Sequence, residues 1–111
     1  MNPRAIASSL LLFTGVAHAA EYGLRSHALP MLVFGAIYFA LGLWLRRAGK
    51  APLIASALLP ALGGFGGAQQ LLAATGAIDP ILAGMVAIDA VVVVCCVWTL
   101  ARGDAASAPT A

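Results

Sequence analysis

Residues 80–100 read PILAGMVAIDAVVVVCCVWTL, with Asp89 as the one charged residue in the stretch. A helix that crosses a membrane needs about 20 consecutive apolar residues. Backbone in hydrocarbon must satisfy its own hydrogen bonds, so such a stretch is expected to be α-helical. The sequence therefore predicts a transmembrane helix at about residues 80–100.

Three further apolar stretches precede this one, and short polar connectors separate all four. They read AIASSLLLFTGVAHAA at 5–20, LPMLVFGAIYFALGLWL at 29–45 and PLIASALLPALGGFGGAQQLLAA at 52–74. Short connectors force neighbouring helices to run antiparallel. We expect an all-α fold, a small polytopic membrane protein with an antiparallel up-and-down four-helix transmembrane bundle. Its helices are predicted at about 5–22, 29–46, 52–74 and 80–100.

The composition agrees with a membrane protein and excludes two other classes. Of the 111 residues, 62% are hydrophobic and 9% are charged, whereas a soluble domain is about 25% charged. Disordered chains need low hydrophobicity and high charge. We predict one four-helix domain over residues 1–102 and a disordered cytoplasmic tail over 103–111.

Basic residues set the expected orientation, because cytoplasmic loops are enriched in Lys and Arg. Placing the 46–51 connector in the cytoplasm leaves one cation, Arg25, outside and puts five inside: Arg4, Arg46, Arg47, Lys50 and Arg102. This predicts a multi-pass protein of the cytoplasmic (inner) membrane with both termini in the cytoplasm. No basic run with interleaved aromatic residues is present, so nucleic acid is not an expected partner.

The first apolar stretch has a second interpretation. MNPR, an apolar core and Ala17-His18-Ala19 resemble a secretory signal peptide with an A-x-A cleavage site. Cleavage would leave three helices, with the new N-terminus outside and the other orientations unchanged. Both interpretations stay open at the level of sequence, and retention is favoured because three helices would shelter the intramembrane polar groups less well.

Asp89 lies about nine residues into its predicted helix, roughly 13 Å deep at 1.5 Å per residue. An ionised carboxylate there costs about 2.5–3.5 kcal/mol, even on the scale that gives the smallest penalty. We therefore expect its side chain to face the protein. It is either a structural clamp between helices or a carboxylate that responds to protons or cations.

Other polar side chains fall at similar depth in the outer half of the predicted bundle. His18 and Glu21 have the i, i+3 spacing of a helical pair. The candidate intramembrane polar site comprises Asp89, Tyr38, Gln69, Gln70, His18 and Glu21. This clustering predicts a small pocket that opens to the outer side.

Gly63 and Gly67 have the G-x-x-x-G spacing that lets two membrane helices approach closely. Pro60, three residues earlier, removes one helical hydrogen bond and favours a kink. We expect these glycines to pack against another helix, either the Gly35 and Gly42 side of the second helix or another subunit.

Cys95 and Cys96 are adjacent in an apolar run, so no disulfide framework is expected. Vicinal thiols can bind soft metals, but a buried cysteine more often fills space as a small apolar residue. No nucleophile, base and orienting group can be assembled. We therefore expect no enzymatic activity, no metal and no cofactor.

Two functions are compatible with these features. The favoured one is a helix-packing or accessory protein that associates with itself, as a homo-oligomer, or with a larger membrane complex. The alternative is a proton-coupled transporter or small-ligand-binding membrane protein that uses Asp89 in an outward-side polar pocket.

Overall fold

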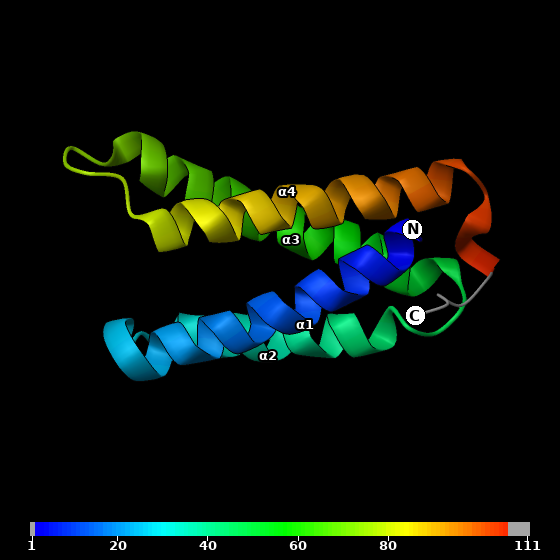
Figure 1. Ribbon diagram of the computed structural model, residues 1–111, viewed down its shortest axis with the longest axis horizontal. Helices are drawn as coiled ribbons and strands as arrows, with labels where there is room; N and C mark the ends of the chain where they lie inside the picture. Colours follow the sequence, from blue (N-terminus) through cyan, green and yellow to red (C-terminus); the bar gives the residue numbers. More distant parts are fainter. Residues whose placement is uncertain (1, 107–111) are drawn as a thin grey trace.

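The computed structural model describes residues 2–106, and every regular element in that range is helical (Figure 1). The elements are α1 Pro3–Glu21, a π-helical turn η1 Tyr22–Ser26, α2 Leu29–Trp44, α3 Lys50–Ala73, α4 Pro80–Ala101 and a 3-10 turn η2 Asp104–Ala106. The prediction of an all-α fold with four α-helices is confirmed for these residues.

Two helix starts follow from local sequence. The Asn2 side chain accepts a hydrogen bond from the Arg4 backbone N–H at 2.9 Å, and Asp79 accepts from the Ile81 N–H at 3.0 Å. A proline follows each of these residues, at the first helical position, where no backbone N–H is needed. These caps fix the first residues of α1 and α4.

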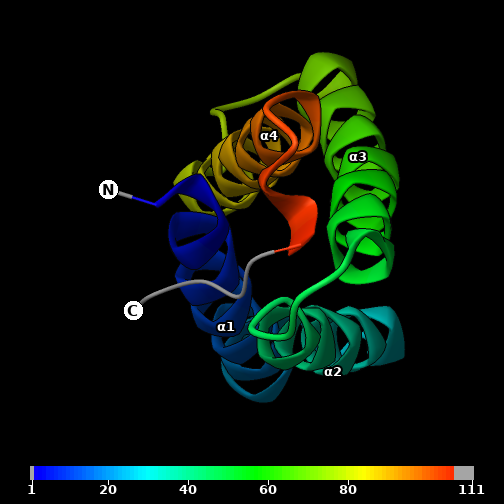
Figure 2. The same cartoon turned by 90° about the vertical axis from the view of Figure 1, so that its right-hand side faces the viewer.

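The helices form two antiparallel hairpins, α1–α2 and α3–α4 (Figures 1 and 2). α1 also packs along α4, whereas α2 and α3 touch each other far less. One end of the bundle carries the N-terminus, the 45–49 connector and η2; we call it the terminus end. The opposite end carries the connectors 22–28 and 74–79; we call it the connector end.

The predicted tail differs from the structure at residues 103–106. Gly103 and η2 turn back onto the terminus end, where Ala105 is buried and its carbonyl accepts from the Gly49 N–H at 2.8 Å. Gly49 has φ +113°, a backbone angle that a side chain strongly disfavours. Sequence gave no sign of this contact, because it depends on a distant carbonyl. Residues 107–111 of the predicted tail lie outside the described range.

Small residues bring α1 and α2 together. A Cβ atom on Gly15 would lie 2.7 Å from the Phe39 backbone nitrogen, and one on Gly35 would lie 2.8 Å from the Gly15 carbonyl oxygen. Ser8 donates to the Gly42 carbonyl at 2.8 Å. Gly35 and Gly42 therefore pack against α1, and the expectation that they would meet the Gly63–Gly67 face is wrong.

The buried residues of α1 and α4 follow a seven-residue repeat, which is the spacing of helices packed nearly parallel. In α4 the buried positions are Met85, Asp89, Val92, Cys96 and Thr99. In α1 they are Arg4, Ala7, Ser8, Leu11, Thr14, Gly15 and His18. Several of these buried residues are polar, so the interior that the two helices share is rich in polar groups.

Two of the four helices, α3 and α4, are long and apolar enough to cross a membrane. α2 is apolar but has 16 residues, so at 1.5 Å per residue it is about 24 Å long. The prediction of four spans rests on a second helix that extends to residue 46 and on a first helix whose polar residues are not weighed. Four spans are therefore not established by helix length and composition.

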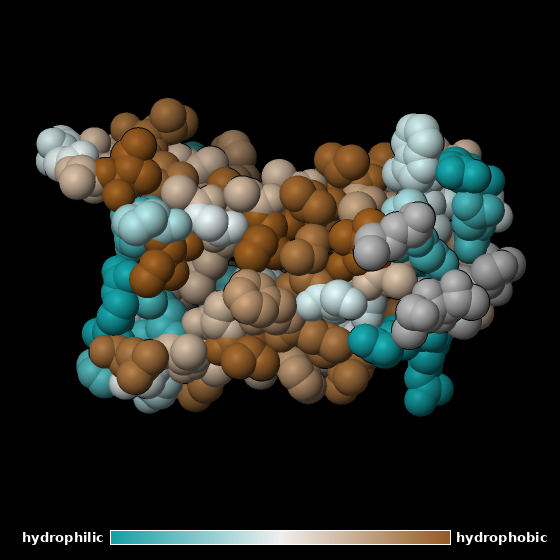
Figure 3. Space-filling view, viewed as in Figure 1, coloured by the Kyte–Doolittle hydropathy of each residue, from teal (hydrophilic) through white to brown (hydrophobic). Residues whose placement is uncertain are grey.

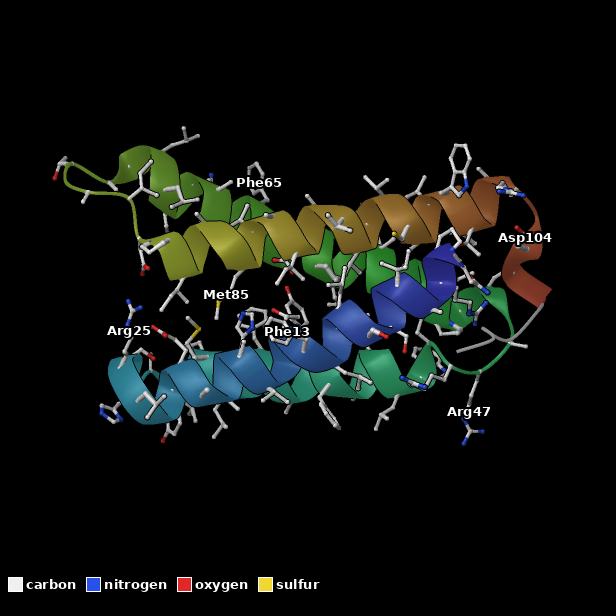
Figure 4. The ribbon with its side chains drawn as sticks, viewed as in Figure 1. Phe13, Arg25, Arg47, Phe65, Met85 and Asp104 are labelled. Carbon is white, nitrogen blue, oxygen red and sulfur yellow. The ribbon has the colours of Figure 1, made fainter. Side chains whose placement is uncertain are left out.

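The outer surface is largely apolar. Leu62, Phe65 and Val94 are between 65% and 70% exposed, and Phe65 points away from the other helices (Figure 4). Hydrophobic residues cover most of the middle of the visible face, and hydrophilic residues gather at both ends (Figure 3). The long axis measures 44 Å, close to the roughly 40–45 Å of a bilayer with its headgroups.

Candidate functional site

A cavity of about 450 Å³ lies between the two hairpins, toward the connector end. All four helices contribute to it, because the weak contact between α2 and α3 leaves this region open. Its polar lining includes Asp89, Tyr38, His18 and Gln70. The structure therefore places four of the six predicted site residues around one space.

Asp89 holds the central position in this site. It sits on the buried stripe of α4, its residue is 5% exposed, and its Oδ1 atom has no hydrogen-bond partner among the described residues. A buried polar atom without a partner costs about 1–3 kcal/mol. The carboxyl group faces the protein, as its depth in the sequence predicts, and it retains an unused acceptor.

Tyr38 reaches Asp89 from α2. Its hydroxyl approaches the carboxyl group, and the side chain is 1% exposed. The hydroxyl lies so close to Gly63 that a Cβ atom there would collide with it, and a Cβ on Gly64 would lie 3.1 Å from the Asp89 Cβ. The glycines of α3 thus make room for the Tyr38–Asp89 pair.

Gly67 has a simpler packing role. A Cβ on Gly67 would lie 2.7 Å from the Val86 Cγ2 atom of α4. The glycine pair Gly63 and Gly67 therefore packs within this chain, against α2 and α4, and needs no second subunit to explain it.

His18 is buried beside Tyr38, with the ring centroids 5.1 Å apart in an edge-to-face arrangement. Its Nδ1 atom lies 2.7 Å from the Thr14 carbonyl oxygen, which can only accept a hydrogen bond. Nδ1 therefore carries a proton. In the neutral ring, Nε2 is then an acceptor, and it makes no hydrogen bond to the described residues.

The remaining predicted residues behave differently. Gln69 and Gln70 are both exposed, and of the two only Gln70 lines the cavity. Glu21 pairs with Arg25, Oε1 to Nε at 3.1 Å, so the expected pair of Glu21 with His18 does not form. The π-helical turn η1 continues directly from α1 and places Arg25 one turn beyond Glu21. The Glu21 carboxylate therefore pairs with the charged guanidinium of Arg25.

Arg25 also joins the two hairpins at the connector end (Figure 4). Its Nη2 atom lies 2.9 Å from Asp79 Oδ2, at the start of α4. The hydrogen bond from Arg25, followed by the capping bond from the Ile81 N–H, holds the pKa of Asp79 below its ordinary value. This cluster carries two carboxylates and one guanidinium, so the connector end beside the cavity is slightly anionic.

Apolar cavity-lining residues were missed by the sequence analysis. Phe34 and Met31 line the cavity from α2, and Met85 points from α4 toward the α1–α2 hairpin (Figure 4). Met85 lies one turn before Asp89 on the same face, so its position was accessible from spacing alone. The ion pair between Arg25 and Asp79 joins residues 54 positions apart, so no local sequence pattern predicts it.

The two cysteines lie away from this cavity. Cys96 is buried in the core, Cys95 is half-buried, and both are free thiols. Within residues 2–106, no three His, Cys, Asp or Glu side chains are grouped as metal ligands. A soft-metal site has no geometric support among these residues.

The chain matches no protein-family model, no curated protein and no solved structure. The site has to be interpreted from its chemistry alone. It combines a sheltered carboxyl group with a free acceptor, a histidine and a tyrosine in a mostly apolar cavity. Such a site can hold a proton or a ligand that donates hydrogen bonds.

Proposed function

We propose that this chain is a small integral membrane protein of the cytoplasmic membrane, with four membrane-spanning helices, that binds a small ligand at Asp89 in exchange for a proton. The observation that carries the proposal is the unpartnered, buried Oδ1 atom of Asp89 beside a cavity of about 450 Å³. Pockets for organic ligands have volumes of roughly 300–1,000 Å³.

Packing supports four spans, although length and composition support two. α1 and α2 lie alongside α3 and α4 over most of the long axis (Figure 1). If α3 and α4 cross the bilayer, α1 and α2 occupy the same depth. The short α2 is then accommodated by local thinning of the bilayer.

The same packing supports a mature protein that retains α1. Ala7, Leu11 and Thr14 are fully buried against the other helices, and Arg4 binds the connector that follows α2. Cleavage after Ala19 would remove these contacts together with His18. Retention places the start of α1, η2 and five of the six cations at the terminus end, and the positive-inside rule puts this end, with both termini, in the cytoplasm.

Access to Asp89 supports the ligand-binding function over the packing function. Asp89 lines the main cavity and also a hollow of about 400 Å³ on the outer face between α3 and α4, beside Gly64 and Phe65. The glycine face that suggested an accessory protein is occupied within the chain. Gly63 and Gly67 therefore do not provide a free surface for self-association or for docking to a larger complex.

The titratable groups that face Asp89 are few. Tyr38 from α2 and His18 from α1 line the same cavity, while α3 contributes glycines, Leu62 and Gln70 there. Glu21, Arg25 and Asp79 lie at the connector end. A proton that leaves Asp89 has a route past Tyr38 and His18 to this end.

Labelling with the lipid-soluble reagent dicyclohexylcarbodiimide tests the proposal, since it reacts with protonated carboxyl groups in the membrane. In proteoliposomes we expect labelling of Asp89 to fall as the pH is raised and the carboxyl ionises. Asp89→Asn should remove the label, and Asp104→Asn should leave it. Labelling of Asp89 that does not change with pH would identify a sealed structural clamp and overturn the proposal.

A further inference from the structure

The hydrogen-bonding groups that face the cavity define the kind of ligand it accepts. Asp89 and His18 both line the cavity. Asp89 Oδ1 is an acceptor without a partner among the described residues, and Nε2 is the acceptor of the His18 ring when that ring is neutral. Both need a donor, and a carboxylate forms its strongest hydrogen bonds with a cationic donor. A neutral hydroxyl would provide one donor for two acceptors.

The rest of the lining favours an organic cation over a metal ion. Phe34 and Tyr38 present aromatic rings to the cavity, and aromatic faces attract cations. Met31, Met85 and Leu82 provide an apolar wall that suits a hydrocarbon body. The space is much larger than an inorganic ion, and among the described residues no metal-ligand group surrounds it.

The charges around the cavity agree with this choice. The cluster at the connector end carries one net negative charge, from Glu21, Asp79 and Arg25. Arg25 already contacts both carboxylates, so it leaves the Asp89 acceptor free. A cation that approaches from this end meets a favourable potential.

We propose that the cavity binds a primary ammonium group carried on a compact apolar or aromatic body. The N–H groups bond Asp89 and His18, and the body fills the space beside Phe34 and Met85. This inference rests on the proposed ligand-binding function and adds the chemical class of the ligand. A quaternary ammonium ion, which has no N–H, is a poorer ligand because it leaves both acceptors without donors.

Four fluorescent probes of matched shape test the assignment on the full chain in lipid nanodiscs. They are 1-naphthylmethylamine, 1-naphthylmethanol, trimethyl(1-naphthylmethyl)ammonium and 1-naphthoate. We expect the primary amine to bind at least about tenfold more tightly than the other three, because a charge-assisted bond to a buried acceptor contributes more than 1.4 kcal/mol.

Variants separate binding in the cavity from partition into lipid. Asp89→Asn should reduce the affinity for the amine to that for the alcohol, while Asp104→Asn, which removes the same charge at the terminus end, should leave it unchanged. Thermal unfolding of each variant verifies that the fold is kept. If Asp89→Asn fails to fold, protection of wild-type Asp89 from carbodiimide by the amine, and not by the alcohol, provides the same test.

The possible results test the primary ammonium assignment separately from the proposed ligand-binding function. Equal binding of all four probes, or tighter binding of the quaternary ion, overturns the primary ammonium assignment. If no probe binds while Asp89 labelling still titrates with pH, the assignment is wrong and the proposed function stands. If labelling does not titrate, the proposed function itself fails.

Discussion

Two buried charged side chains, Arg4 and Asp89, are bonded in opposite ways. At the terminus end the Arg4 guanidinium, 1% exposed, donates to the carbonyls of Leu45, Gly49, Ala105 and Arg47, at 2.9, 3.2 and 3.0 Å for the first three. Toward the connector end the hairpins separate around a cavity, and Asp89, near the middle of α4, lines it with an Oδ1 atom that has no partner among the described residues. The comparison separates an end where a buried charge holds the helices together from the cavity where we propose that a ligand binds.

The largest expected effect comes from the terminus end. Arg4→Ala should lower the free energy of unfolding by about 3 kcal/mol or more, because four carbonyls, two of them in buried hydrogen bonds, lose a charged donor. Thermal unfolding in detergent measures the loss. Arg47→Ala, whose exposed side chain points away from the bundle (Figure 4), should change stability by less than about 0.5 kcal/mol. Equal effects of the two variants would contradict a clamp at Arg4.

A smaller effect on stability is expected from a glycine that lines the cavity. Gly63→Ala places a methyl group against the Tyr38 hydroxyl, so we expect a loss of about 1 kcal/mol as this side chain shifts away from Asp89. Gly66→Ala, which meets nothing within 4 Å, should gain up to about 1 kcal/mol from helix propensity. Denaturant titration of both variants measures the difference. A neutral Gly63→Ala would show that the Tyr38–Asp89 contact is loose.

The smallest expected effect concerns the ion pair between Arg25 and Asp79. The pKa of Asp79 is lower in the folded protein than in the unfolded chain, so the pair stabilises the fold above the unfolded pKa of about 3.9. That stability is lost as the pH falls through the folded pKa. The melting temperatures of wild type and Asp79→Asn should differ at neutral pH and become similar near pH 3. A constant difference between them would exclude this linkage.

The sequence predicted the helices better than their partners. The apolar runs located the four helices, because that signal is local. The caps Asn2-Pro3 and Asp79-Pro80 are local signals too, but they were not used, and α1 begins at Pro3 rather than at about residue 5. The depth of Asp89 also predicted that its carboxyl would turn inward, since lipid exposure is costly. Contacts between helices depend on relative rotation, which a single apolar run leaves undetermined.

The candidate site was also predicted in part: the depth of its residues was predicted, and their contacts were not. His18, Tyr38, Gln70 and Asp89 were predicted to lie in the same half of the bundle, and they line one cavity. Gln69 is excluded from it by its place on the helix circumference. The seven-residue spacing of Ser8 and Gly15, matched by that of Gly35 and Gly42, was the available signal for the α1–α2 contact.

The acceptors of Arg4 have a consequence for how the chain assembles during synthesis. Its carbonyl partners lie at residues 45, 47, 49 and 105, so the full set of acceptors exists only once the chain has been made as far as Ala105. Until then the guanidinium lacks one of its four acceptors. Closure of the bundle around Arg4 therefore follows the synthesis of α4.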